Sequence, residues 1–343
     1  MGVYLIVIAN AKNQKFKLKE KKMPSNYQES QRTKAVDLIK SKNPVFYGSH
    51  GGRKFMTKFR DFVLMENLNN LFAPIRLEVV EYFKENKVSW WGGRKPTGHT
   101  LSSQIACVNH LYQIRNDKDA VLSILKNISS EFKDVLPIIT DKYKPAFIQF
   151  ESVSDKDNLN EGVPNRGSNC TSVDALIFAV HNDGSNWLIP IEWKYTEFYN
   201  NQNKATEGCS KDPVNCKGEI RKKRYTKLIN DSSQLKSENQ DCYYFEPFYQ
   251  LMRQTLWVEQ MINNRQHETL KATDFLHVHV IPSENSDLLD KKYKCSDLGM
   301  ETTWRNHLQD QSKYLIITPE KLLTGLNNKT YKKLLEYLKI RYW

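Results

Sequence analysis

The chain has 343 residues, with 51 Lys and Arg against 39 Asp and Glu, and 39% of its residues are hydrophobic. This apolar content is enough to build a buried core and excludes an intrinsically disordered chain. The net charge of +12 favours nucleic acid as a partner, although a basic balance serves solubility alone about as often.

The first 22 residues differ from the rest of the chain. The apolar stretch 2–9 has no basic segment before it and is short for a secretory signal or a membrane span. A lysine-rich run follows at 12–22. Residues 1–22 are therefore interpreted as a basic N-terminal arm or a mis-called translation start, and no targeting segment or membrane contact is assigned.

Residues 23–90 are predicted to form a helical N-terminal layer. One apolar patch at helical spacing surrounds Ile39, and a second runs from Phe55 to Val63. The glycines within 48–52 separate the two patches.

A glycine-rich turn then leads into an amphipathic helix that begins near Leu101, with Thr100 as its predicted N-cap. The tetrapeptide Gly-Gly-Arg-Lys occurs in this turn, at 92–95, and also at 51–54. Because the flanking sequences differ, chance similarity is the preferred interpretation.

Strands are predicted at 146–153, 172–180 and 187–195. The last two are joined by His181-Asn182-Asp183-Gly184-Ser185, which has the composition of a hairpin turn. The middle of the chain is therefore expected to be a small antiparallel unit.

Residues 200–240 are polar and offer few anchors for a core, so they are predicted to be a long excursion or lid. The run Arg221-Lys222-Lys223-Arg224 suits a phosphate clamp, and a solvated loop explains it equally well.

A strong helix is predicted at 246–263, followed by strands at 275–282 and 314–318 and by a C-terminal helix. Three polar residues share one face of the first helix and either reach DNA or form an ordinary polar surface: Gln250, Arg253 and Gln254.

Asp174 is the single charged residue in a strand that is otherwise apolar on both faces. Glu192 and Lys194 lie two residues apart on the next strand, so their side chains leave the same face. A three-residue turn at 182–184 makes the numbers of opposed residues sum to 366, which places Asp174 across from Glu192. Pro190 could introduce a bulge and turn Glu192 elsewhere.

Two carboxylates at this separation repel each other unless a cation lies between them. Magnesium prefers such oxygen ligands, and it would lower the pKa of a bound water and neutralise charge on a phosphate. Lys194 would orient the nucleophile or stabilise the same charge.

Asp174 before the hairpin and Glu192-Trp193-Lys194 after it resemble the D…(D/E)-X-K signature of the PD-(D/E)XK superfamily. Segments 170–175, 191–197 and 102–111 resemble a family of bacterial restriction endonucleases. The resemblance covers most of residues 90–320.

The resemblance implies an α/β fold, a restriction-endonuclease-like mixed β-sheet flanked by helices, that cleaves DNA to leave 5′-phosphate ends. It implies that Asp174, Glu192 and the carbonyl of Trp193 hold Mg²⁺ while Lys194 assists the attacking water.

An earlier acid often completes such sites, and Glu151 is the candidate, with Glu131 as the reserve. Gln104 either supports the metal site and its DNA or caps a neighbouring backbone group.

The six cysteines contain no Cys-x-x-Cys pair, which favours free thiols and a cytoplasmic location. A zinc site at Cys209, Cys216 and Cys242 is a weaker alternative, because the spacing is irregular. His277 and His279 alternate on a strand, and a structural role is favoured over metal binding because no third ligand is evident.

These observations predict a magnesium-dependent endonuclease of restriction type that acts on double-stranded DNA, with its core in residues 91–343. A homodimer is expected by analogy, because cutting both strands commonly needs two active sites. A repair or recombination nuclease of the same fold and a non-catalytic DNA-binding module are the alternatives.

Overall fold

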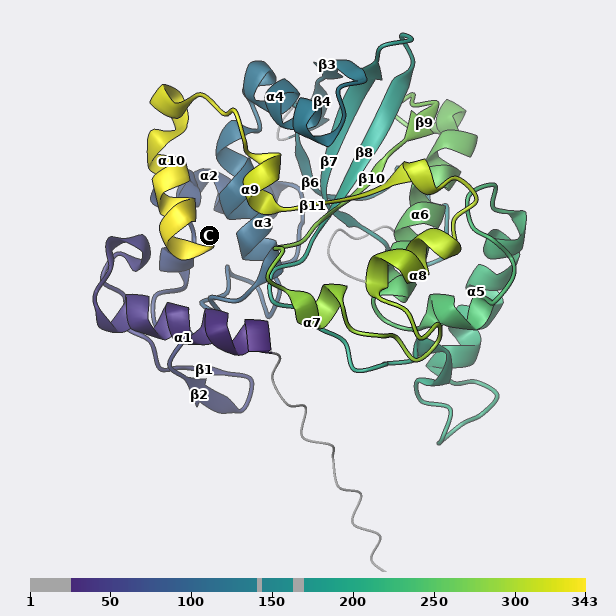
Figure 1. The fold of residues 1–343 in the computed structure, drawn as a ribbon, viewed down its shortest axis with the longest axis horizontal. Helices are drawn as coiled ribbons and strands as arrows, with labels where there is room; N and C mark the ends of the chain where they lie inside the picture. Colours follow the sequence, from purple (N-terminus) through teal and green to yellow (C-terminus); the bar gives the residue numbers. More distant parts are fainter. Residues whose placement is uncertain (1–25, 141–143, 163–169) are drawn as a thin grey trace, which may run out of the picture.

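The computed structural model describes residues 26–140, 144–162 and 170–343, so the predicted arm at 1–22 lies outside the described residues. A seven-stranded mixed sheet stands at the centre with helices packed on both faces (Figure 1). This arrangement confirms the predicted fold class. In the described part of the chain, no helix is long and apolar enough to cross a membrane.

The sheet has the strand order β11-β10-β8-β7-β3, with β6 paired to β7 and β9 paired to β8. Four strands pair antiparallel: β3 (Phe132–Leu136), β6 (Gln149–Ser152), β7 (Val173–His181) and β8 (Asn186–Trp193). Three more join in parallel: β9 (Asp274–Phe275), β10 (His277–Val280) and β11 (Tyr314–Ile317). The three predicted central strands thus belong to a larger sheet, in which β3 has no counterpart in the prediction.

Each face of the sheet has its own hydrophobic cluster, which explains why β7 is apolar on both faces. One face is covered by α1 (Asn26–Lys40), α2 (Arg76–Glu85), α3 (Ser103–Leu111), α4 (Lys118–Ile128), α9 (Pro319–Leu322) and α10 (Asn328–Arg341). The other is covered by α5 (Lys217–Asp231), α6 (Phe248–Asn263), α7 (Ser286–Leu289) and α8 (Met300–Asn306).

Two small hairpins lie apart from the main sheet: β1 (Arg53–Phe55) with β2 (Lys58–Arg60), and β4 (Ile138–Thr140) with β5 (Lys144–Ala146). The first replaces the helical patch predicted from Phe55 to Val63, so that prediction is wrong. Phe55 pairs with Lys58, and the turn between them closes the hairpin with Met56 at positive φ. The spacing of the aromatic residues, which predicted a helix, fits two short strands equally well.

The N-cap of helix α3 lies two residues after the predicted one. Its N-cap is Ser102, whose hydroxyl accepts a hydrogen bond from the Ile105 amide. Thr100 instead donates its hydroxyl to the carbonyl of Phe62, at 2.8 Å. Thr100 therefore ties the loop to the N-terminal layer and does not cap the helix.

Residues 200–240 are not an irregular excursion, because the 15-residue helix α5 occupies 217–231. Tyr225 and Ile229 are four residues apart on one face of this helix, and both are buried in the hydrophobic cluster on that side of the sheet. Two buried residues four positions apart are therefore enough to hold this polar segment on the sheet as a helix.

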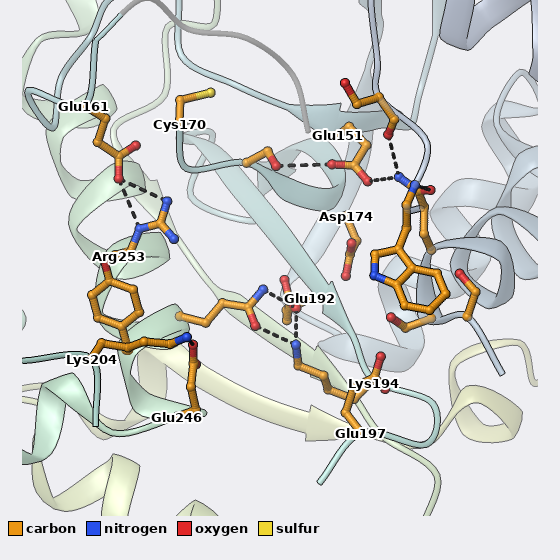
Figure 2. Close-up of a pocket in the computed structure, with 18 of the residues that line it drawn as sticks. Glu151, Glu161, Cys170, Asp174, Glu192, Lys194, Glu197, Lys204, Glu246 and Arg253 are labelled. Atoms are coloured by element: carbon orange, nitrogen blue, oxygen red, sulfur yellow. Dashed lines mark hydrogen bonds and ion pairs between the residues drawn. The ribbon is translucent and has the colours of Figure 1, made fainter. Parts of the chain in front are cut away.

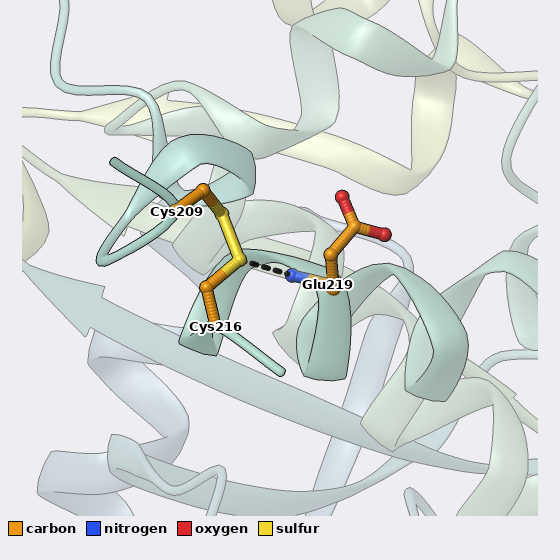
Figure 3. A group of neighbouring side chains, drawn as sticks. All are labelled: Cys209, Cys216 and Glu219. Carbon is orange, nitrogen blue, oxygen red and sulfur yellow. Dashed lines mark hydrogen bonds between the residues drawn. A yellow bond between two sulfur atoms is a disulfide. The ribbon is translucent and has the colours of Figure 1, made fainter. Parts of the chain in front are cut away.

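Four of the six cysteines form disulfides, so the prediction of free thiols is wrong for them. Cys209 bonds to Cys216 at the start of α5 (Figure 3). Cys242 bonds to Cys295. The zinc alternative fails for the same reason, because these sulfur atoms are already bonded in pairs. The inference of a reducing compartment loses its support as well.

Candidate active site

The register between β7 and β8 is the predicted one. Opposed residue numbers sum to 366, as in the pair Ala175 and Ile191. The next pair along this register is Asp174 with Glu192. Pro190 lies within the ladder without shifting it, so no bulge turns Glu192 away.

Glu151 extends this pair of acids to a row of three. On β6, the pairs Phe150 with Ala175 and Ser152 with Val173 flank the position where Glu151 faces Asp174. Three adjacent strands therefore carry the carboxyl groups of the acid row, which we define as Glu151, Asp174 and Glu192 (Figure 2).

Glu151 has an unusual backbone, with φ at 48°. A glutamate in this left-handed region is uncommon, and such strained positions cluster at functional sites. Gln104 Nε2 donates to its Oε1 at 2.7 Å, and the Ser172 hydroxyl donates to its Oε2 at 3.2 Å. The side chain of Glu151 is thus held in place from α3 and from the start of β7.

Glu192 is only 2% exposed and is held by α6. Gln250 Nε2 donates to its Oε1 at 2.7 Å, and Gln254 Nε2 donates to its Oε2 at 2.5 Å. The ammonium of Lys194 lies 2.6 Å from Glu192 Oε1 and 2.6 Å from Gln250 Oε1. Lys194 and Glu192 therefore form a buried ion pair whose remaining polar atoms are engaged by helix α6.

Trp193 contributes to the site through its backbone. Its amide donates to Asp174 Oδ2 at 2.7 Å. In a strand, the N–H and C=O of one residue point to the same side, so the carbonyl of Trp193 also faces β7. The indole packs on the opposite face of the sheet, with its ring 4.6 Å from that of His110.

The acid row has fewer positive charges than carboxyl groups. Burial raises the pKa of Asp174 well above its usual range, and the carboxylates of Glu192 and Glu151 raise it further. Burial alone would lower the pKa of Lys194, but Glu192 and other neighbouring anionic groups outweigh it and raise that pKa. One ammonium faces three carboxyl groups, an arrangement that a divalent cation would stabilise.

The acid row opens into a cavity of about 940 Å³. Its lining also includes the four cations of what we call the basic wall: Lys204, Arg221, Arg224 and Arg253. Figure 2 shows Lys204 and Arg253 of this wall across the cavity from the acid row. Arg253 is itself paired with Glu161, at 3.1 Å. Lys204 of the same wall is paired with Glu246, at 3.5 Å, so two of the four cations have a carboxylate of the cavity lining beside them.

The structure brings only part of the predicted DNA-contact set to this cavity. Its lining includes Gln104, Arg221, Arg224, Gln250 and Arg253.

Three predicted contact residues do not line it. Lys222 and Lys223 lie on other faces of α5, because residues 221, 224 and 225 share the inward face at helical spacing. Gln254 is 1% exposed and bonds to Glu192, so it supports the acid row from behind and does not present an amide to a phosphate.

The reserve acid Glu131 is wrongly placed by the prediction. Its carboxylate lies 3.7 Å from His181, at the end of β7 opposite to Asp174.

The prediction missed two residues of the site: Ser172, which contacts Glu151, and Glu161, which contacts Arg253. Ser172 had a signal, since it lies two residues before Asp174 and so shares its strand face. Glu161 had none, because its partner Arg253 lies 92 residues away.

His277 and His279 are buried beside the site in β10. Burial lowers the pKa of His277 to about 3 and that of His279 well below its usual range, so both rings are neutral. His279 Nδ1 lies 2.8 Å from the Tyr314 hydroxyl. In the described residues, Cys209, Cys216 and Glu219 are the one set of three whose potential ligand atoms all lie within 4.8 Å of one another, and its two sulfur atoms are bonded to each other. Neither these histidines nor the three carboxyl groups of the acid row form a set that close.

One comparison with known proteins gave a match. The family model described as Restriction Endonuclease associating with ARP matches residues 7–343. No curated protein matches the chain, and no solved structure matches it either.

Proposed function

The chain belongs to the family Restriction Endonuclease associating with ARP, and from this premise we propose that it is a magnesium-dependent nuclease of PD-(D/E)XK type acting on double-stranded DNA. The observation that carries the proposal is the acid row beside Lys194 at the edge of a cavity with a basic wall. The family match supports a nuclease, and the row supplies its chemistry.

The donor set fits Mg²⁺. The ligands would be Asp174, Glu192, Glu151 and the carbonyl of Trp193, all of them the hard oxygen donors that this ion prefers. Among the described residues, Asp174 accepts a hydrogen bond only at Oδ2, which leaves Oδ1 for an ion. Bound there, the ion would acidify a water and neutralise charge on the scissile phosphate.

The protein's own groups divide the remaining work. Lys194 stays protonated and can orient the attacking water or stabilise charge that develops on the phosphate. Gln250 and Gln254 fix Glu192, and Gln104 fixes Glu151. The carboxyl groups of Glu192 and Glu151 are therefore already oriented before DNA binds, so the site needs less rearrangement of these side chains during the reaction.

The basic wall supplies contacts to the DNA backbone. Arg221, Arg224 and Arg253 line the cavity opposite the acid row, at a place where the phosphates next to the scissile one would lie. Arginine binds phosphate through a planar fork of donors, which fixes register as well as adding affinity.

The test is cleavage of plasmid and of unmodified phage DNA, with magnesium or with EDTA, by the wild type, Asp174→Ala and Lys194→Ala. We expect cutting with magnesium only and a loss of about 10²-fold to 10³-fold or more in each variant. Glu131→Ala is the matched control, because this acid lies outside the row and should leave the rate unchanged.

The products sort the alternatives. Discrete fragments support restriction-type endonuclease activity, whereas progressive shortening identifies an exonuclease of the same fold. DNA retention without cutting under any condition overturns the nuclease proposal in favour of a binding module. The family description also names an association with ARP, and we propose that this chain has such a partner.

A further inference from the structure

The hairpin of β1 and β2 exposes an unusual set of side chains. Arg53, Lys54, Lys58 and Arg60 are all exposed on its two short strands. Met56 at its tip is 81% exposed, and Phe59 is 75% exposed. Four cations and two large apolar side chains are thus exposed within the eight residues 53–60.

This arrangement is unfavourable in the isolated protein. Arg53 lies directly opposite Arg60 in the antiparallel ladder, and like charges at opposed positions destabilise a hairpin. Within the described residues, no ion pair joins Lys54, Lys58 or Arg60 to a carboxylate, and the adjacent acid is the exposed Asp61. A bound polyanion would offset the repulsion between these cations.

The second Gly-Gly-Arg-Lys segment packs beside the hairpin. The Phe55 ring lies 5.1 Å from the Trp91 ring, and a Cβ at Gly92 would lie 3.4 Å from Phe55. Arg94 and Lys95 of this segment are exposed. The two copies of the tetrapeptide, which the sequence alone attributes to chance, therefore place four cations on neighbouring surfaces, and Lys58 and Arg60 of the hairpin bring the number to six. We call residues 51–60 and 92–95 together the basic ribbon.

Trp91, the residue before segment 92–95, links the basic ribbon to the acid row. The Trp91 amide donates to Gln104 Oε1 at 2.8 Å, and Gln104 Nε2 donates to Glu151 Oε1 at 2.7 Å. Trp91 also lines the cavity. One hydrogen-bonded chain of three residues thus runs from the basic ribbon to the acids.

We propose that the basic ribbon binds duplex DNA by entering its major groove next to the cavity, and so sets the duplex on the acid row. This inference rests on the proposed function. The major groove is wide enough for a two-stranded β-ribbon, whose cations contact the phosphates on both rims. Met56 at the tip and Phe59 on β2 would meet apolar base edges such as the thymine methyl group.

The test compares binding of a fluorescent 30-base-pair DNA duplex, in EDTA and over a range of salt concentrations, by the wild type and by the triple variant Lys54→Ala/Lys58→Ala/Arg60→Ala. Losing three phosphate contacts should reduce the slope of log affinity against log salt by roughly 2 to 3. We expect binding at moderate salt to weaken at least about tenfold. Equal slopes in wild type and variant would overturn the proposal.

The matched control removes the same charge elsewhere. Lys321, Lys329 and Lys333 are exposed near the C-terminus, and their triple alanine variant should keep the wild-type slope. If the slope of log affinity against log salt falls equally in both variants, net charge alone is responsible and the proposal fails.

A second variant changes no charge. A Cβ at Gly51 would lie 1.8 Å from the Asp61 carbonyl oxygen, so Gly51→Ala should distort the hairpin. We expect it to weaken DNA binding while the melting temperature of the core stays unchanged.

Duplex RNA separates groove insertion from simple attraction. Its major groove is too deep and narrow for side chains to read, so the ribbon variant should bind RNA as the wild type does. An equal loss on RNA and DNA would overturn the groove assignment. These binding measurements use EDTA, so they test the basic ribbon even if the protein does not cleave DNA. If the wild type cleaves DNA but the ribbon variant binds DNA as the wild type does, the ribbon proposal fails and the proposed nuclease function stands.

Discussion

The carboxyl group of Asp174 is buried between Glu192 and Glu151, and burial followed by their charge raises its pKa. Between the ordinary value, about 3.9, and the raised one, the folded protein keeps a proton that the unfolded chain has released. The free energy of unfolding therefore falls as the pH rises through this window.

Asp174→Asn should therefore stabilise the metal-free protein at pH 8, because the neutral amide removes the free-energy cost, in the folded state, of an acid that is harder to ionise there than in the unfolded chain. We expect a melting temperature higher by about 1 to 4 °C in EDTA, with a difference that shrinks as the pH falls. Magnesium should raise the melting temperature of the wild type more than that of the variant. A variant that melts lower at pH 8, or a wild type indifferent to magnesium, contradicts the assignment.

Gln104 acts on the acid row through Glu151 and does not itself carry the chemistry. Gln104→Ala should lower the cleavage rate at saturating DNA about 10-fold to 100-fold and raise the magnesium concentration needed for half-maximal rate. Gln309→Ala, an exposed glutamine in another part of the chain, is the control. An unchanged magnesium requirement would show that Gln104 does not position Glu151.

At the scale of elements, two helices and the three strands β6, β7 and β8 fix the candidate site. α3 supplies Gln104 from one side of the sheet, and α6 supplies Gln250 and Gln254 from the other. β7 and β8 hold Asp174 and Glu192 at opposed positions. The site therefore depends on how the two helical layers pack on the sheet.

The two disulfides should stabilise the layer around α5 and α6 unequally. In the chain-entropy model, Cys242–Cys295, with a separation of 53 residues, contributes roughly 4 kcal/mol, and Cys209–Cys216, with a separation of 7, roughly 2 kcal/mol. Denaturant unfolding of the paired serine variants should show this order.

The same experiment has an internal control. Reductant should destabilise the wild type, and it should have no further effect on a protein that lacks both disulfides. A wild type that is insensitive to reductant while its thiols react with a label would show that these cysteines are not paired.

At the scale of the molecule, the described part of the chain holds one acid row, whereas a double-strand cut needs two attacks. We therefore expect two copies per duplex when DNA is cut, with a mass of twice 40.2 kDa plus the DNA by light scattering in calcium or EDTA. At low protein concentration, nicked plasmid should accumulate before linear product. One chain per duplex, with linear product and no nicked intermediate, would contradict this expectation.

Much of the fold follows from local pattern. The strands β7 and β8 could be predicted because both are apolar runs that flank a turn with glycine at 184, and their register followed from the length of that turn. Helix α6 followed from its apolar periodicity. The hairpin of β1 and β2 could not be predicted, since Phe55, Phe59 and Phe62 fit a helical spacing as well as two short strands.

The sequence by itself determined the opposed positions of Asp174 and Glu192, because turn length and strand alternation are local properties. Only the tertiary structure decided what surrounds them. Gln104 meets Glu151 across 47 residues, Gln254 meets Glu192 across 62, and the two Gly-Gly-Arg-Lys segments meet through Phe55 and Trp91. Contacts of this kind depend on how whole helices and hairpins pack against the sheet, and the periodicity of a single segment carries no information about its distant partner.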